Sequence, residues 1–164
     1  LLREIRIGDL DAYTDMHQDT QFVRYFGSGE PVSQLDCWKV LTMLAGHWQL
    51  YGFGMWLVEE KSTNTMIGRV GLWQPVGWPA IELGWGIARP YWGQGLAREA
   101  AMAARNWGFE HLDVDQLISV IHPDNVASKK LAERIGQRFC QQKEVGGKDS
   151  DVYQITRDQY NQLS

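Results

Sequence analysis

The chain has few cysteines, no long apolar run and no excess of positive charge, and each absence narrows what it can do. Cys37 and Cys140 are the two cysteines among 164 residues, and they lie far apart in the sequence. This spacing fits neither a disulfide framework nor a cysteine metal site. We therefore expect two buried thiols in a cytoplasmic protein, and no bound metal.

No apolar stretch approaches the length of a membrane-spanning helix, and charges in the opening LLREIRIGDL interrupt any signal-peptide core. The formal net charge of −4 argues against a general binder of nucleic acid or of anionic membranes. It still allows a local basic patch around a phosphate. We expect neither a nucleic-acid nor a membrane partner, and a monomer or homodimer.

A length of 164 residues predicts a single domain over residues 1–164 that can bury a proper core. Apolar spacing, caps and turn residues mark the elements of the first half. They are a strand at 2–7, a helix from Gly8 and Asp9 to about His17, an aromatic loop or broken helix at 21–31, and a helix that Ser33 caps and Gly52 ends.

The second half is predicted to be rich in strands. Its elements are a hairpin of 52–60 and 65–75 around the turn KSTN, a strand at 80–88, a helix from Gly95 to Trp107, a strand at 116–122, a helix from Val126 to Ile135, and a closing hairpin of 138–145 and 150–156. Antiparallel hairpins on both sides of one β-α-β unit predict an α+β protein with a mixed, mostly antiparallel sheet flanked by helices.

Residues 85–99 read WGIARPYWGQGLARE, so a strand-like run meets a proline, two aromatics and two glycines before helix-forming residues begin. Glycines at 93 and 95 let backbone N–H groups approach a ligand closely. The helix that follows adds unpaired N–H groups and the positive end of its dipole. This combination predicts an anion site, most often one for phosphate.

Two common phosphate loops do not fit these glycines. A P-loop ends in Gly-Lys-Ser/Thr, and Gly147-Lys148 lacks both the hydroxyl and the partner glycine. A dinucleotide fingerprint needs a third glycine where Arg98 stands, although Asp115 lies at the distance of a ribose-binding acid. Three predicted antiparallel strands also precede the loop, which is the wrong architecture for that fold.

Residues 92–97, Trp-Gly-Gln-Gly-Leu-Ala, resemble the pyrophosphate loop of the GNAT acyltransferase superfamily, Arg/Gln-x-x-Gly-x-Gly/Ala. Trp92 stands where most members carry Arg or Gln, and Tyr91, Trp92 and Glu99 match the variant of the RimJ/RimL-type N-terminal acetyltransferases. The segment 123–131, PDNVASKKL, resembles the family's Asn-x-x-Ser helix start. Ile135-Gly136 resembles its closing Leu-Gly-Phe, with the aromatic displaced to Phe139.

The resemblance implies a GNAT fold whose sheet splays between residues 80–88 and 116–122 to form an acyl-CoA cleft, with acetyl-CoA as co-substrate. Backbone N–H groups of residues 93–97 would hold the pyrophosphate, and Gly84 and Gly86 would let the pantetheine arm approach. The cofactor-binding residues so implied are Ile87, Ala88, Trp92, Gly93, Gln94, Gly95, Leu96, Ala97, Asn125 and Ser128.

The family's usual course is direct attack of an amine on the thioester in a ternary complex. The amide of Ile87 or a neighbour is the expected oxyanion donor. Glu82 is the candidate general base, and His122 is the alternative. Glu82 can equally be a solvent-facing charge with no catalytic role. Many members carry a Tyr acid where this chain has Ala132, so Ser128 is the candidate acid, unless its hydroxyl only serves the helix start.

The expected acceptor is a primary amine that Arg24, Tyr25, Phe26 and Trp73 help to bind. Near the expected entrance we count Asp19, Glu30 and Glu82, too few carboxylates for a polycation. A peptide or protein N-terminus is therefore favoured. The alternatives are a small-molecule amine, such as a polyamine, amino acid or aminoglycoside, and a non-catalytic acyl-CoA sensor.

Overall fold

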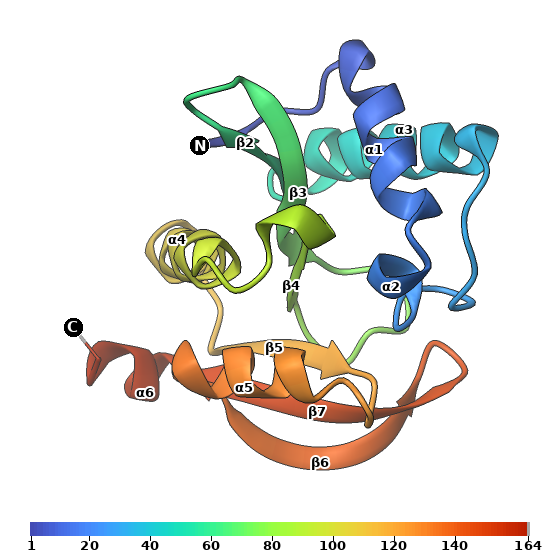
Figure 1. Ribbon diagram of the computed structural model, residues 1–164. Coiled ribbons are helices and arrows are strands. Elements are labelled where there is room, and N and C mark those ends of the chain that lie inside the picture. Colours follow the sequence, from blue (N-terminus) through green and yellow to red (C-terminus); the bar gives the residue numbers. More distant parts are fainter. Residues whose placement is uncertain (164) are drawn as a thin grey trace. The chain divides into compact units, whose positions relative to one another are not determined.

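The computed structural model describes residues 1–163, whose contacts divide them into two compact units (Figure 1). Unit 1 comprises Leu1–Gly71 and Trp85–Ala100, and unit 2 comprises Leu72–Gly84 and the chain from Ala101 onward. Three elements contribute to both units, namely β3 (Thr65–Trp73), β4 (Glu82–Ile87) and α4 (Leu96–His111). The single domain expected over residues 1–164 stays a prediction.

Unit 1 contains the N-terminal helices and the strand order β1-β2-β3-β4, in which β2 is antiparallel to β1 and β3. Figure 1 shows α1 and α3 lying together beside β3. The elements wholly within unit 1 are β1 (Leu2–Arg3), the 3-10 helix η1 (Ile7–Asp9), α1 (Leu10–Gln18), α2 (Thr20–Val23), α3 (Gln34–Tyr51), β2 (Met55–Glu60) and the 3-10 helix η2 (Arg89–Tyr91).

Helix α3 begins and ends where the sequence predicts. The Ser33 side chain accepts the N–H of Asp36 at 3.2 Å, and Gly52 ends the helix with φ of 72°. The three helices of unit 1 bury an apolar core with β2 and β3. Its buried members are Tyr13, Met16, Phe22, Val23, Cys37, Leu41, Leu57 and Met66.

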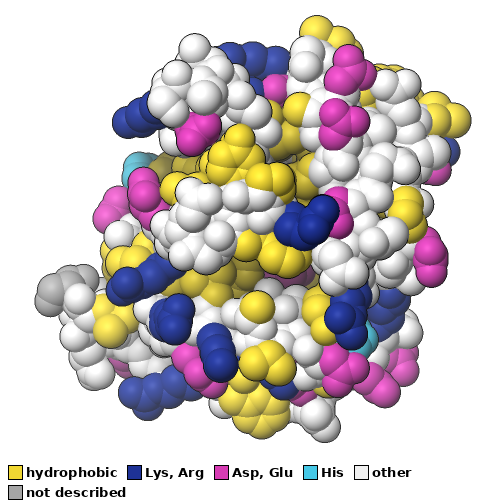
Figure 2. Space-filling model, in the orientation of Figure 1, with side chains coloured by type: hydrophobic (Ala, Val, Ile, Leu, Met, Phe, Trp, Pro, Cys, Tyr) yellow, Lys and Arg dark blue, Asp and Glu magenta, His cyan; other side chains and the backbone are white. Residues whose placement is uncertain are grey.

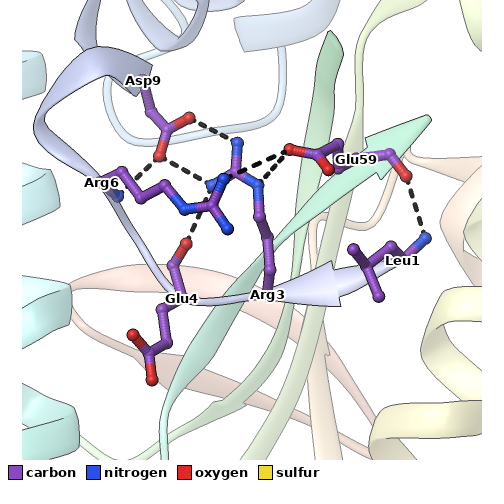
Figure 3. A network of polar contacts seen from close by, with 6 residues as sticks. All are labelled: Leu1, Arg3, Glu4, Arg6, Asp9 and Glu59. Carbon is purple, nitrogen blue, oxygen red and sulfur yellow. Dashed lines mark hydrogen bonds and ion pairs between the residues drawn. The ribbon is translucent and has the colours of Figure 1, made fainter. Parts of the chain in front are cut away.

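Strand β1 ends at Arg3, so the predicted strand 2–7 is wrong beyond that residue. The cause is the Asp9 carboxylate, which accepts the Arg6 N–H at 2.7 Å and so turns the chain into η1. Arg3 donates to both Asp9 oxygens, at 2.9 and 2.6 Å, and to Glu59 on β2 (Figure 3). The three side chains are only 7–10% exposed, so one buried cation joins two buried carboxylates.

Replacing Asp9 with Asn should destabilise the protein by about 1–3 kcal/mol at pH 7, because the buried guanidinium of Arg3 loses a charged partner. Burial alone would raise the pKa of Asp9, but the hydrogen bonds from Arg3 and from the Arg6 N–H hold the pKa below its usual value. Such a carboxyl contributes stability above its unfolded pKa of about 3.9 and loses it as the pH falls through the folded value.

Urea unfolding between pH 7 and pH 2 measures both effects. The wild type should lose stability in acid more steeply than Asp9→Asn does. Asp113→Asn, at an exposed site, is the control and should follow the wild type. Parallel acid curves for wild type and Asp9→Asn would contradict this account of the network.

Unit 2 is built on the strand order β4-β5-β7-β6. Strand β7 is antiparallel to β5 and β6, whereas β4 is parallel to β5. Within this unit Figure 1 shows α5 lying along β5. Its remaining elements are β5 (Gln116–Ile121), α5 (Val126–Arg134), β6 (Arg138–Val145), β7 (Lys148–Thr156) and α6 (Arg157–Asn161).

Three features of unit 2 depart from the predictions. Helix α6 was not predicted, although Thr156 and Gln159 cap it reciprocally. Phe139 is 54% exposed on β6, and Gln137 takes the buried position after Gly136. The expectation of a buried thiol is wrong for Cys140, which is exposed on the same strand, and right for Cys37.

The seven strands of the described chain pair mostly antiparallel in the order β1-β2-β3-β4-β5-β7-β6. Helices flank them, which confirms the predicted α+β class. No helix within residues 1–163 is both long and apolar enough to cross a membrane.

Candidate functional site

The loop 92–95 connects η2 to α4 with its backbone open to solvent. Gly93 and Gly95 have φ of 75° and 81°, and a Cβ at either would meet no atom within 4 Å. Positive φ favours glycine, and the open space is where a ligand can approach. The Glu99 N–H donates to the Gly95 carbonyl at 3.0 Å, so the first-turn N–H groups of α4 begin directly after the loop.

Side chains brace this loop from within unit 1. The Trp92 indole N–H donates to the Ile87 carbonyl at 2.5 Å, and the Gln94 amide donates to the Pro90 carbonyl at 3.1 Å. Trp92 thus shapes the loop where the family motif has Arg or Gln. Arg89 pairs with Asp19 at 2.5 Å, so this carboxylate already has a cation and is a poor partner for a cationic acceptor.

Ala88 has both backbone groups engaged inside unit 1. Its N–H donates to the Ile67 carbonyl at 2.8 Å, and its carbonyl accepts the Tyr91 N–H at 2.9 Å. A hydrogen bond from the Ala88 N–H to a pantetheine arm would have to break its bond to Ile67, whereas the Ala88 carbonyl can accept a second hydrogen bond. These two bonds fix the turn after Ile87, and the cofactor-binding role expected of Ala88 stays a prediction.

Two strand glycines let β4 approach its neighbours closely. A Cβ on Gly86 would lie 3.0 Å from Phe26 and 3.1 Å from Phe22, whose rings stack with centroids 5.0 Å apart. A Cβ on Gly68 of β3 would clash with the Gly86 carbonyl oxygen. The missing side chain of Gly86 thus lets these aromatic rings of unit 1 pack against β4, and the approach of a pantetheine arm to this strand stays a prediction.

The proposed acceptor residues of unit 1 lie at the end of α2 and just beyond it. Phe26 belongs to the aromatic cluster beside β4, while the Arg24 guanidinium lies 5.2 Å from the Tyr25 ring centroid. Arg24 is exposed, and Tyr25 and Phe26 are half-buried. The structure thus brings Phe26, but not Arg24, into the side-chain cluster against the strand.

Arg69 on β3 is a candidate residue that the sequence reading missed. Its Nη1 donates to the Tyr13 hydroxyl at 2.9 Å, and its guanidinium carbon lies 5.4 Å from the Phe26 ring centroid. Its Nε is buried without a hydrogen-bond partner in the described structure. The available signal was a cation in the middle of the apolar strand TMIGRVGLW.

In unit 2, Glu82 and Trp78 form a defined pair. The Trp78 indole N–H donates to the Glu82 carboxylate at 2.6 Å. The Trp78 ring is wedged against the β6–β7 turn, since a Cβ on Gly146 would lie 2.9 Å from it. Glu82 is half-buried, and its carboxylate is held in one orientation by a side chain four residues earlier.

The backbone pairing of β4 with β5 is short. In unit 2 the two strands register at Glu82 and Ile118, and the Ile118 N–H donates to the Ile81 carbonyl at 3.0 Å. One residue further, the Ser119 hydroxyl donates to the Leu83 carbonyl at 2.6 Å. A side chain therefore takes over from the backbone, as is expected where two parallel strands begin to diverge; the cleft itself stays a prediction.

Asn125 and Ser128 lie together at the start of α5. The Asn125 side chain accepts the Ser128 N–H at 3.1 Å and so caps the helix. Both residues are half-buried, and the neighbouring His122 accepts the Asp124 N–H at 3.1 Å. Figure 2 shows Lys and Arg side chains over the region of α5, whose own basic residues are Lys129, Lys130 and Arg134.

Trp73 ends β3 and is half-buried in unit 2. Its role in acceptor binding stays a prediction. In the chain up to residue 163, no group of three or more His, Cys, Asp or Glu side chains has the arrangement of a metal site.

Comparison with known proteins identifies the family. The sequence model of the acetyltransferase (GNAT) domain matches residues 1–138. The uncharacterized protein YkkB of Bacillus subtilis is 34% identical over 113 residues, which cover 68% of this chain and 64% of that protein. The chain thus matches less than two thirds of that relative's length. An acetyltransferase structure from Agrobacterium tumefaciens superposes with a TM-score of 0.84 at 30% identity, over 95% of this chain and 90% of that one.

More distant structures share the fold. RimL, a ribosomal L7/L12 α-N-protein acetyltransferase solved with coenzyme A, has a TM-score of 0.78 at 18% identity, covering 96% of this chain and 94% of its own. Spermidine N-acetyltransferase from Vibrio cholerae, solved with CoA and spermine, has a TM-score of 0.76 at 21% identity, covering 98% and 97%. With the domain match, the glycine loop and this fold, the chain belongs to the GNAT acetyltransferase family.

Proposed function

We propose that the protein transfers an acetyl group from acetyl-CoA to a primary amine by direct attack in a ternary complex. The observation that carries this proposal is the exposed glycine loop in front of α4, with two positive-φ glycines and open space at both. Backbone N–H groups of residues 93–97 bind the pyrophosphate, because a helix N-terminus and adjacent free amides favour an anion. Trp92 and Gln94 act by holding the loop in shape.

The remaining roles are proposed residue by residue. The Ile87 N–H stabilises the oxyanion, and Glu82 takes the proton of the attacking amine directly or through water. The Asn125 amide contacts the pantetheine arm, and the Ser128 hydroxyl protonates the leaving thiolate. Ala132 is fully buried and has no hydroxyl, which leaves Ser128 as the nearby donor on α5.

Peptide or protein α-amines are the favoured acceptors over polyamines and aminoglycosides. A polycation must exchange the hydration of each ammonium for a carboxylate. Asp19 is already paired with Arg89, so one of the few candidate carboxylates is occupied. Arg24, Tyr25 and Phe26 of unit 1 and Trp73 of unit 2 are each proposed to contribute to acceptor binding, and three of the four are aromatic, which suits a peptide.

One assay tests the reaction. The protein is incubated with acetyl-CoA and, in separate reactions, with short peptides, amino acids, spermidine or kanamycin. Release of the free CoA thiol is measured in each reaction. Turnover with an α-amine and little with either polycation is expected. Fast turnover of a polycation with silent peptides would overturn the acceptor choice, and tight acetyl-CoA binding with no turnover of any amine would favour an acyl-CoA sensor.

Substitution of Asn125 and Ser128 should separate binding from proton transfer. Asn125→Ala removes a ground-state contact to the arm and should raise KM for acetyl-CoA by about tenfold with a smaller change in kcat. Ser128→Ala should lower kcat by about tenfold or more with KM little changed. Thermal melts monitor the loss of the helix cap in Asn125→Ala. Identical kinetic effects of the two substitutions would contradict these separate roles.

A further inference from the structure

We propose that Arg69 binds a carboxylate of the amine acceptor, so that the acceptor is a carboxylate-bearing amine of amino-acid or short-peptide type. This inference rests on the proposed acetyl transfer and narrows the acceptor. Every group that it uses lies in unit 1.

Arg69 is a cation that pairs with no carboxylate in the described part of the chain. It stands on β3 opposite Leu57, a fully buried residue of the core, so its side chain leaves the sheet on the face covered by the helices. Each ion pair found in the described residues involves another cation. Removing a charge from water is costly unless a counter-charge and hydrogen bonds replace the hydration. The buried, unpartnered Nε shows that this replacement is incomplete.

Among residues 1–163, the Arg69 side chain contacts aromatic side chains and forms an ion pair with no carboxylate. The guanidinium carbon lies 5.9 Å from the Tyr13 ring centroid and 5.4 Å from that of Phe26. Burial raises the pKa of Tyr13, so its phenol is neutral at pH 7. Burial and the charge of Arg69 lower the pKa of His17, which stacks on Tyr13, to about 4. The Arg69 site therefore consists of one positive charge beside the aromatic rings of Tyr13 and Phe26.

The Arg69 site lies directly beside Gly86 and Ile87, the part of β4 where the amine is proposed to attack. Gly68, which precedes Arg69, packs so closely on β4 that a Cβ there would clash with the Gly86 carbonyl. Phe26 bridges the same two points, since its ring lies over Arg69 and 3.0 Å from the Cβ position of Gly86. An acceptor whose amine attacks beside Ile87 would therefore place a nearby substituent within reach of the guanidinium.

The chemistry of a guanidinium selects the ligand. Its planar fork of N–H groups matches a carboxylate bidentately, and cations such as spermidine are repelled. An α-amino acid, or a peptide with an acidic group near its N-terminus, carries the required amine and carboxylate on one small body. The aromatic rings add apolar contact for its side chain.

Paired acceptors test the proposal. The amines are phenylalanine, its carboxamide, and a C-terminally amidated dipeptide whose second residue is aspartate. For each carboxylate-bearing amine we take the ratio of its kcat/KM to the kcat/KM of the carboxamide. This ratio should be at least about tenfold higher in the wild type than in Arg69→Met, because that variant loses a charged hydrogen-bonded pair. Comparing ratios between the proteins cancels differences in amine basicity. The free acid and the acidic dipeptide distinguish an α-carboxylate from a side-chain carboxylate.

Arg69→Lys keeps the charge without the fork and should retain part of the preference, which a purely structural role would not predict. Arg134→Met, at an exposed position of α5, is the charge-matched control and should keep the wild-type ratios. Acetyl-CoA affinity and the melting temperature report whether each variant is folded.

A second measurement does not depend on turnover. Calorimetry on the protein saturated with CoA compares N-acetylphenylalanine with N-acetylphenylalanine amide. The acid should bind at least about tenfold more tightly to the wild type and equally with the amide to Arg69→Met. Equal binding to the wild type would overturn the carboxylate site even if acetyl transfer stands. A clear preference for the acid without any acetyl transfer would support the site and reject the proposed function.

Discussion

Replacing Gly95 with Asp should raise the Kd for acetyl-CoA by about a hundredfold or more, equivalent to about 2.7 kcal/mol, in a protein that still folds. Gly95 stands immediately before α4, with φ of 81° and open space around its missing Cβ. An Asp carboxylate there would meet the first-turn N–H groups that the pyrophosphate requires. It would also place a negative charge beside a doubly negative ligand.

Matched substitutions separate charge from backbone strain. Gly95→Asn has the same shape and tolerates positive φ, so its Kd should rise far less than that of the Asp variant. Raising the ionic strength should recover part of the binding of Gly95→Asp and little of that of Gly95→Asn. Gly52→Asp repeats the strain at φ of 72° at the end of α3, again in open space, and should leave Kd unchanged. Calorimetry that gives the two Gly95 variants equal affinity for acetyl-CoA would contradict the proposal that this loop binds the pyrophosphate.

What the sequence predicted well depends on chemistry local to a few residues. The cap at Ser33, the stop at Gly52 and the glycine loop before α4 each need only neighbouring residues to form, and the structure has them where expected. The mixed, mostly antiparallel sheet was predicted correctly because hairpins on both sides of one β-α-β unit leave few topologies. The loop's resemblance to a known family was borne out by the domain match.

What the sequence could not predict depends on register and on side chains that meet across the fold. Asp9 shortens β1 because its carboxylate accepts the Arg6 N–H and pairs with Arg3, which a strand pattern does not reveal. The Ala88 N–H is occupied because Ile67 lies opposite it. Arg69 was overlooked because its significance comes from Gly68 and Phe26 bringing it next to β4. Thr156 and Gln159 have the spacing of a helix capping box, which could have predicted α6. The strand pattern of the preceding residues led instead to the prediction of a hairpin alone.

The pairing of Trp78 with Glu82 bears on the proposed role of Glu82 as general base. The indole N–H bond at 2.6 Å and the packing of the ring on Gly146 fix one oxygen of the carboxylate. The Glu82 carboxylate thus has a defined place at the start of β4, where a general base needs a constant position relative to the amine. Trp78→Phe keeps an aromatic ring, although a smaller one, and removes the indole N–H, so it should lower kcat by a smaller factor than loss of the carboxylate does.

Replacing Glu82 with Gln should lower kcat by about 10²- to 10⁴-fold, because the amide keeps the shape of the side chain but cannot take a proton from the amine. Its carbonyl oxygen can still accept the Trp78 indole N–H, so the melting temperature and KM for acetyl-CoA should change little. The deficit should shrink as the pH rises toward the pKa of the acceptor amine, because more of the amine is then already neutral and needs no base. Glu133→Gln, at an exposed position of α5, is the matched control and should keep the wild-type kcat. Initial rates of CoA thiol release across a range of pH measure all of this. A Glu82→Gln variant with a wild-type kcat at neutral pH would reject Glu82 as the base and direct the search to His122 at the end of β5.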